Sequence, residues 1–245
     1  MINNTNFDIL GPSYKLAASK HIVPENQATI IFSHGLEGGK DGSKWKEWSA
    51  SLPNHGFNVV RFNYRGCGKH TDYPSDGDFF NTTLTSRISD YDLVVNSLPD
   101  FGMDSFSVGA VGSSFGGMVV AASSNPKCKA IVLIATPFSL DFDFETQTSS
   151  GCIELESGEF LSGEFRKDVV LYDIGEALKR YKIPTLIIHG SEDEVVPVDH
   201  AFKLYNFIEA PRELYIIEGA DHSLTRLSHR NEAISLITTW MIEHL

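Results

Sequence analysis

The chain has 245 residues, of which 42% are hydrophobic and 21% charged, and its formal net charge is −12. This composition is that of an ordinary globular protein and excludes general disorder, and the length suffices to bury a sizeable core. A strongly negative chain repels phosphate backbones and anionic lipid, so we expect neither nucleic-acid nor membrane binding.

The N-terminal sequence MINNTNFDIL has no basic region followed by an apolar one, so it predicts no secretory signal. The three cysteines, Cys67, Cys128 and Cys152, are widely spaced, which is typical of reduced thiols rather than of a disulfide framework. No histidine pair shows a metal-ligand pattern such as His-Glu-x-x-His, so no metal site is expected. We therefore expect a cytoplasmic protein.

Short β-branched runs recur along the chain, and most of them are continuously apolar, as expected for parallel strands covered on both faces. The predicted strands lie within 14–23 and at 28–33, 58–64, 105–112, 130–135, 185–190 and 213–219. Stretches with helical spacing separate them, at 44–56, 85–100, 116–126, 200–210 and 231–245. This alternation predicts an α/β fold with a mainly parallel sheet, as one domain over residues 1–245.

One connection is too long for a simple crossover. About 50 residues separate the strand that ends at Ala135 from the strand that begins at Thr185, roughly twice what a helix and two loops need. Within them, CIELESGEFLSGEF (152–165) alternates around a Ser-Gly pair and predicts a β-hairpin. We expect a cap insertion at about 137–182, over the edge of the sheet.

The insertion contains two groups of residues that are open to two interpretations. From residue 141 to 164 it has seven acidic residues and no Lys or Arg, which either repel anionic substrates or form a solvated surface. Its aromatic residues either line an apolar acyl pocket or form the insertion's own core. They are Phe138, Phe142, Phe144, Phe160 and Phe165.

The segment AVGSSFGGMV (110–119) contains the pattern Gly-x-Ser-x-Gly, with Ser114 between Gly112 and Gly116. The pattern alone is weak, but here a predicted strand leads directly into Ser114 and a predicted helix follows it. That is the strand–turn–helix arrangement in which a serine is held on a strained turn with its hydroxyl exposed. Side chains at the two glycine positions would crowd this turn.

A serine hydroxyl becomes a good nucleophile only when a base takes its proton, so a histidine oriented by a carboxylate is needed. HGSEDEVVP (189–197) and EGADHSL (218–224) follow two later strands. Because the carboxyl ends of parallel strands meet at one edge of the sheet, Asp193 and His222 are expected on the same side as Ser114.

In this order, GSSFG, HGSEDEVVP and GADHSL resemble the nucleophile, acid and histidine motifs of the α/β-hydrolase superfamily, over nearly all of residues 25–245. The resemblance implies Ser114, Asp193 and His222 as the catalytic residues and no cofactor. Glu192 and Glu194 are alternative acids beside Asp193, but the superfamily's pattern places the acid at 193.

The loop SHGLEGG (33–39) resembles the superfamily's His-Gly-x loop. The resemblance implies an oxyanion hole made by the backbone N–H groups of Leu36 and Phe115, the latter directly following the nucleophile. His34 and His189 precede glycines at the ends of predicted strands, and from this position we expect them to be structural.

RFNYRGCGKH, followed by FFNTTLTSRISDYDLVV, is similar to the cinnamoyl and feruloyl esterase group. This resemblance implies a serine carboxylesterase that acts on small, neutral acyl or aromatic esters. Two alternatives remain: an aminopeptidase whose cap carboxylates bind a substrate ammonium group, and a non-catalytic ligand-binding protein on the same scaffold. The oligomeric state is left open.

Overall fold

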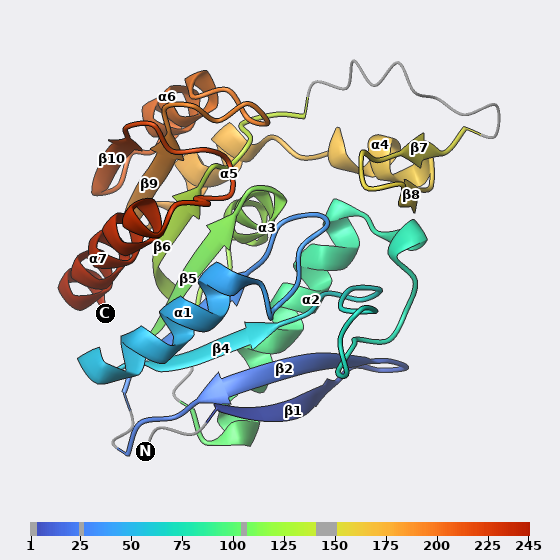
Figure 1. The fold of residues 1–245 in the computed structure, drawn as a ribbon, viewed down its shortest axis with the longest axis horizontal. Helices are drawn as coiled ribbons and strands as arrows, with labels where there is room; N and C mark the ends of the chain where they lie inside the picture. The colour runs from blue at the N-terminus through green and yellow to red at the C-terminus, as the bar shows by residue number, and fades with distance from the viewer. Residues whose placement is uncertain (1–3, 25–26, 104–106, 141–150) are drawn as a thin grey trace.

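The computed structural model describes residues 4–24, 27–103, 107–140 and 151–245. Its main sheet has eight strands in the order β1-β2-β4-β3-β5-β6-β9-β10 (Figure 1). β2 pairs antiparallel with β1 and β4, and the other pairs are parallel. The strands are β1 Asn4–Leu10, β2 Lys15–His21, β3 Thr29–Ser33, β4 Asn58–Phe62, β5 Val108–Ser113, β6 Cys128–Ile134, β9 Thr185–Gly190 and β10 Arg212–Ile217.

Helices cover both faces of this sheet. α1 (Ser43–Ser51) and α7 (Leu227–His244) share one apolar cluster with the strands. The other face carries α2 (Leu84–Ser97), α3 (Phe115–Ser123), α5 (Ile174–Tyr181) and α6 (Asp199–Phe207). Three short 3-10 turns are also described: η1 Leu52–His55, η2 Phe79–Asn81 and η3 Leu98–Phe101. The predicted α/β fold with a mainly parallel sheet is confirmed.

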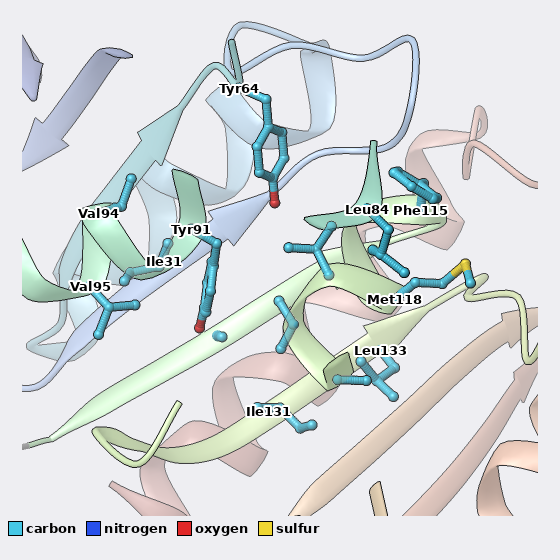
Figure 2. Packing of buried hydrophobic residues seen from close by; sticks show 14 of the residues in the cluster. Ile31, Tyr64, Leu84, Tyr91, Val94, Val95, Phe115, Met118, Ile131 and Leu133 are labelled. Carbon is cyan, nitrogen blue, oxygen red and sulfur yellow. The ribbon is translucent and has the colours of Figure 1, made fainter. Parts of the chain in front are cut away.

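The continuous apolar runs follow from this double covering. In β3, Ile31 belongs to the cluster of α2 and α3, whereas Ile30 and Phe32 belong to the cluster of α1 and α7. Successive side chains of a strand point to opposite faces, so both faces of β3 require apolar residues. Figure 2 shows Tyr91 of α2 and Met118 of α3 on the same side as Ile31.

The insertion contains the predicted hairpin, whose strands are β7 (Ile153–Glu154) and β8 (Phe160–Leu161). Gly158 takes a φ of +85° in the turn between them. A short helix, α4 (Glu164–Val169), follows and packs on α2 (Figure 1). We refer to residues 151–172 as the cap.

The phenylalanines of the insertion divide between a core and the surface. Phe165 is 1% exposed and its ring lies 5.4 Å from that of Phe115, whereas Phe160 is 41% exposed. Phe138 packs on Phe207 of α6 at 5.3 Å. The other two, Phe142 and Phe144, lie outside the described residues. Phe165 therefore contributes to the core.

Polar contacts join the cap to η2 and to the beginning of α2. The N–H of Ser162 donates to the Phe80 carbonyl at 2.9 Å. The N–H of Thr85 donates to the Asp168 carboxylate at 3.0 Å, and the Thr85 hydroxyl lies 2.6 Å from that of Tyr172. In the ranges that the structure describes, no helix is both long and apolar enough to cross a membrane.

Candidate active site

Ser114 lies on the sharp turn between β5 and α3 (Figure 1). Its backbone has φ 55° and ψ −127°, a sparsely populated conformation that costs about 1–3 kcal/mol. Backbone hydrogen bonds hold it there: the N–H of Ser114 donates to the Ile134 carbonyl at 2.8 Å, and its own carbonyl accepts from the N–H groups of Gly117 at 2.9 Å and Met118 at 3.4 Å. The predicted strand–turn–helix geometry is present.

The glycines beside Ser114 are required by close backbone contacts. A Cβ atom on Gly116 would overlap the backbone carbonyl oxygens of Ser33 and His34. A Cβ atom on Gly112 would come within 2.6 Å of the Gly116 carbonyl oxygen. The loop after β3, the end of β5 and the start of α3 therefore pack backbone against backbone, with no room for side chains at 112 and 116.

The loops after β9 and β10 bring Asp193 and His222 together. His222 Nδ1 lies 2.8 Å from Asp193 Oδ2. Glu192 and Glu194, the alternative acids, are both exposed, and Asp221 instead accepts a hydrogen bond from the N–H of Thr225 at 2.8 Å. The residue that contacts His222 is thus Asp193.

Further donors surround the Asp193 carboxylate. Its Oδ1 accepts from the N–H groups of Val195 at 2.9 Å and Val196 at 2.8 Å, and His189 Nε2 lies 3.2 Å from Oδ2. Burial raises the pKa of Asp193, but the hydrogen bonds from His189, His222 and Val196 outweigh burial and hold that pKa well below its usual range. Asp193 is therefore a carboxylate at neutral pH.

His189 is completely buried, and its contact with Asp193 was not predicted from the sequence. Its Nε2 lies 2.8 Å from the Val196 carbonyl as well as near Asp193. The ring thereby ties the strand end to the acid loop, which fits the structural role expected for it. The contact between His189 and Asp193 depends on how residues 189–196 fold. No short sequence pattern would have predicted it.

The structure brings the acid and the histidine into contact, but it joins neither to Ser114 by a hydrogen bond. Within the described residues, the Ser114 hydroxyl makes no hydrogen bond. Contacts between nucleophile and base are often long in the absence of substrate and shorten when it binds. The three catalytic assignments remain predictions.

The loop after β3 lies against Ser114. A Cβ atom on Gly35 would lie 3.4 Å from Ser114 Cβ, so this loop passes the nucleophile closely. Neither the N–H of Leu36 nor that of Phe115 donates a hydrogen bond to any described residue. Two free backbone donors at a helix N-terminus and a facing loop can stabilise a developing oxyanion.

Two basic residues close to this site were not predicted from the sequence. Lys44 of α1 places its Nζ 2.9 Å from the hydroxyl of Ser113, the neighbour of Ser114. Arg87 of α2 donates to the carbonyls of Gly35 and Leu36. A basic residue on a helix ordinarily reads as a surface residue, so no sequence signal distinguishes these two.

The cap also touches this loop. The hydroxyl of Ser157, in the hairpin turn, donates to the carboxylate of Glu37. In the part of the chain that the structure describes, no group of three or more His, Cys, Asp or Glu side chains is arranged to hold a metal ion.

Solved structures share this architecture. Est1E from Butyrivibrio proteoclasticus, with bound ferulic acid, superposes with a TM-score of 0.84 at 21% identity, over 97% of this chain and 98% of that one. A dienelactone hydrolase from Anabaena variabilis gives a TM-score of 0.73 at 16% identity, over 100% and 99%. The fold is that of the α/β hydrolases.

Curated relatives are longer than this chain. The uncharacterized protein YfhR of Escherichia coli K12 is 29% identical over 201 residues, which are 80% of this chain and 63% of YfhR. The α/β-hydrolase domain-containing protein aho-3 of Caenorhabditis elegans is 25% identical over 207 residues, 82% of this chain and 54% of aho-3. The chain thus spans roughly half to two thirds of the length of these relatives.

The sequence profile of the Prolyl oligopeptidase family matches residues 44–245, well over half of the chain. The matched range includes Ser114, Asp193 and His222, and it begins after the loop that contains Leu36. Together with the strained turn and the paired acid and histidine, this match identifies a hydrolase scaffold, and the chain belongs to the prolyl oligopeptidase family.

Proposed function

We propose that the chain is a serine hydrolase that cleaves small, neutral carboxylic esters. The observation that carries the proposal is the position of four loops, which follow β3, β5, β9 and β10 at the carboxyl ends of the parallel strands. They hold Ser114 on a strained turn, a His222–Asp193 hydrogen bond of 2.8 Å at the same edge of the sheet, and two free backbone donors. Each part supplies one requirement of acyl transfer: nucleophile, oriented base and oxyanion stabilisation.

In the proposed mechanism, the Ser114 hydroxyl attacks the ester carbonyl carbon while His222 Nε2 takes its proton. The Asp193 carboxylate accepts the hydrogen bond from Nδ1, which leaves Nε2 free to act as base and stabilises the imidazolium. The N–H groups of Leu36 and Phe115 donate to the oxyanion. His222 returns its proton to the leaving alcohol, and a water molecule activated by His222 then hydrolyses the acyl-enzyme.

The charge of the cap supports neutral substrates. Glu154, Glu156, Glu159 and Glu164 are all exposed on it, and of these Glu164 pairs with Lys167 at 2.7 Å. A field of this sign disfavours acyl-CoA and phosphorylated esters. Aromatic acyl groups are favoured because the fold resembles a protein solved with ferulic acid bound.

A labelling experiment tests this function. Wild-type protein, Ser114→Ala and the matched control Ser113→Ala are treated with a fluorophosphonate, and intact mass is measured. We expect labelling of wild type and Ser113→Ala only. We also expect kcat for p-nitrophenyl esters to fall by at least roughly 10³-fold in Ser114→Ala. Near-wild-type turnover in that variant refutes the nucleophile. Folded wild type that binds esters saturably, yet neither labels nor turns over, is a ligand-binding protein.

The family match favours a second candidate, an amide hydrolase of the aminopeptidase type. In it, the exposed cap glutamates would attract the substrate's ammonium group. An acyl p-nitrophenyl ester and the p-nitroanilide of the same acyl group, with and without a free α-amino group, separate the two functions. A higher kcat/KM for the aminoacyl anilide reverses the ranking.

A further inference from the structure

Arg87 is an unusual side chain for its position. It is 1% exposed, and in the described part of the chain no carboxylate lies within ion-pair distance of it. A buried, unpaired guanidinium loses its hydration and is costly unless other groups accept its hydrogen bonds. Two backbone carbonyls do so: that of Gly35, 3.0 Å from Nη1, and that of Leu36, 2.5 Å from Nη2. Nη2 also lies 3.5 Å from Cys67 Sγ, whereas Nε has no hydrogen-bond partner among the described residues.

We propose that Arg87 is the positioning residue of the oxyanion hole, because it fixes the peptide between Gly35 and Leu36 with the Leu36 N–H directed at the reacting carbonyl. The inference rests on the proposed function for its catalytic consequence. The positioning itself is a statement about the loop and can be tested separately.

Because the peptide bond is planar, a side chain that holds the Gly35 carbonyl also fixes the direction of the Leu36 N–H. In a trans peptide, the C=O of one residue and the N–H of the next point in opposite directions, and no described peptide bond is cis. The Gly35 carbonyl also accepts from the N–H of Gly38 at 3.2 Å and lies 2.8 Å from His34 Nδ1. All these donors hold the Gly35 carbonyl on one side of the peptide bond. The Leu36 N–H therefore points to the opposite side, where it donates to no described residue.

His34 contributes to the same arrangement and depends on Arg87. Burial, together with the positive charge of Arg87, lowers the pKa of His34 to about 3, so the ring is neutral in activity assays near pH 7. Its Nε2 accepts from the N–H of Tyr64 at 3.3 Å, which assigns the proton to Nδ1, where it is donated to the Gly35 carbonyl. If the Gly35–Leu36 peptide were flipped, the Gly35 carbonyl would lose its hydrogen bonds from Arg87, His34 and Gly38. Its oxygen would then face the oxyanion in place of the Leu36 N–H.

The Arg87 guanidinium also lies near Phe115, the residue with the second proposed oxyanion donor. Its Cζ lies 5.3 Å from the ring centroid of Phe115, whose N–H is the other proposed oxyanion donor. The same Cζ lies 4.7 Å from the ring centroid of Tyr64. Arg87 thus connects the loop after β3 with the start of α3, and it places a positive charge behind the oxyanion.

The test compares Arg87→Met and Arg87→Lys with Arg65→Met. Arg65 is the matched control, since it pairs with Asp90 of α2 and donates to the Ser86 carbonyl, with no contact to the loop of Gly35. All kinetic values are expressed per mole of folded protein, determined by thermal unfolding. The readouts are kcat, KM, affinity for a trifluoromethyl ketone, and a crystal structure of each Arg87 variant.

We expect Arg87→Met to lower kcat by roughly 10²–10³-fold with KM changed less than about threefold, because the hole acts on the transition state. Affinity for the ketone, whose adduct carries an oxyanion, should fall by a similar factor. Arg87→Lys should recover part of both, and Arg65→Met should lower stability while leaving kcat nearly unchanged. The crystal structure of Arg87→Met should show a rotated Gly35–Leu36 peptide.

Unchanged kcat and ketone affinity in both Arg87 variants overturn the proposal, and so does an unrotated peptide in their crystal structures. If Arg87→Met does not fold, Arg87→Lys decides by the same criteria. Absence of Ser114-dependent turnover in the wild type instead overturns the proposed function. In that case, the orientation of the peptide in the crystal structures still decides the role of Arg87.

Discussion

Replacing Asp193 by Asn tests the contact between acid and histidine. Asp193 Oδ1 accepts two backbone N–H groups, at 2.9 and 2.8 Å, whereas Oδ2 faces the ring nitrogens of His222 at 2.8 Å and His189 at 3.2 Å. Only the amide oxygen of Asn can accept the two backbone bonds, so its NH₂ group must face the two rings. A donor then opposes His222 Nδ1.

The expected loss follows from the tautomer. To accept from the NH₂ group, His222 must carry its proton on Nε2, where it cannot take a proton from Ser114. The corresponding change in other serine triads lowers kcat by about 10⁴-fold, which equals about 5.4 kcal/mol at 1.36 kcal/mol per tenfold. Loss of the charged acceptor should also lower stability by about 2–3 kcal/mol, or roughly 4–12 °C in Tm.

Steady-state kinetics with a p-nitrophenyl ester measures the first effect and thermal unfolding the second. Glu192→Gln is the control, because Glu192 is the adjacent, exposed carboxylate; we expect its kcat to stay within about twofold of wild type. If Asn at 193 retains more than a tenth of wild-type kcat in folded protein, the inferred role of Asp193 is wrong.

The same carboxylate makes stability depend on pH. The pKa of folded Asp193 lies below that of an unfolded Asp, near 3.9, so its contribution is complete above that value and is lost as the pH falls toward the folded pKa. The stability difference between wild type and Asp193→Asn should therefore shrink between pH 5 and pH 2 in urea unfolding. A constant difference over this range contradicts the assignment.

Two further predictions concern packing and charge beside the nucleophile. Gly116→Ala should lower the free energy of unfolding by about 3 kcal/mol or more, because the added Cβ overlaps the carbonyl oxygen of Ser33 and neither backbone can move freely. The measurement is the urea midpoint, and an unchanged midpoint would show that this contact relaxes easily. Burial lowers the pKa of Lys44 to about 8 in the folded protein. Between about pH 8 and pH 10.5, the unfolded state therefore binds more protons than the folded state, so the stability of the wild type should rise with pH in this range. After allowance for the screening of a partly exposed side chain, we expect a rise of roughly 1–2 kcal/mol that Lys44→Met lacks; equal pH slopes would refute it.

Local patterns were sufficient to predict the parts of the site that are made by single segments. The turn around Ser114 needs a strand, two small residues and a helix in direct succession, and all of these can be read from ten residues. The acid and the histidine could be placed because parallel strands end at one edge, as β9 and β10 do here. The hairpin of the cap was found from its alternation around Gly158.

Other parts of the structure were not predicted, and for most of them the reason is that distant contacts stabilise them. β1 was not predicted, since it is a largely exposed edge strand in which only Ile9 is fully buried. α5 has a local signal that was not used: Asp173 caps it by accepting from the N–H of Glu176 at 2.9 Å, and basic residues lie in its last turn. Arg87 contacts carbonyls 52 and 51 positions away in sequence, a relation that only the folded chain reveals.

The way in which the cap is attached has a practical consequence for redesign. Its polar links to the body include contacts with η2, with the beginning of α2 and with the carboxylate of Glu37, whereas backbone atoms crowd the two glycines beside Ser114. We therefore expect substitutions to be tolerated better on the surface of the cap than in the turn around Ser114. A library that randomises the exposed residues of the cap, while keeping its buried residues and the segments 33–39 and 112–117 constant, would explore new substrate ranges on an unchanged framework. The buried cap residues to keep are Ile153, Leu161, Phe165 and Val169.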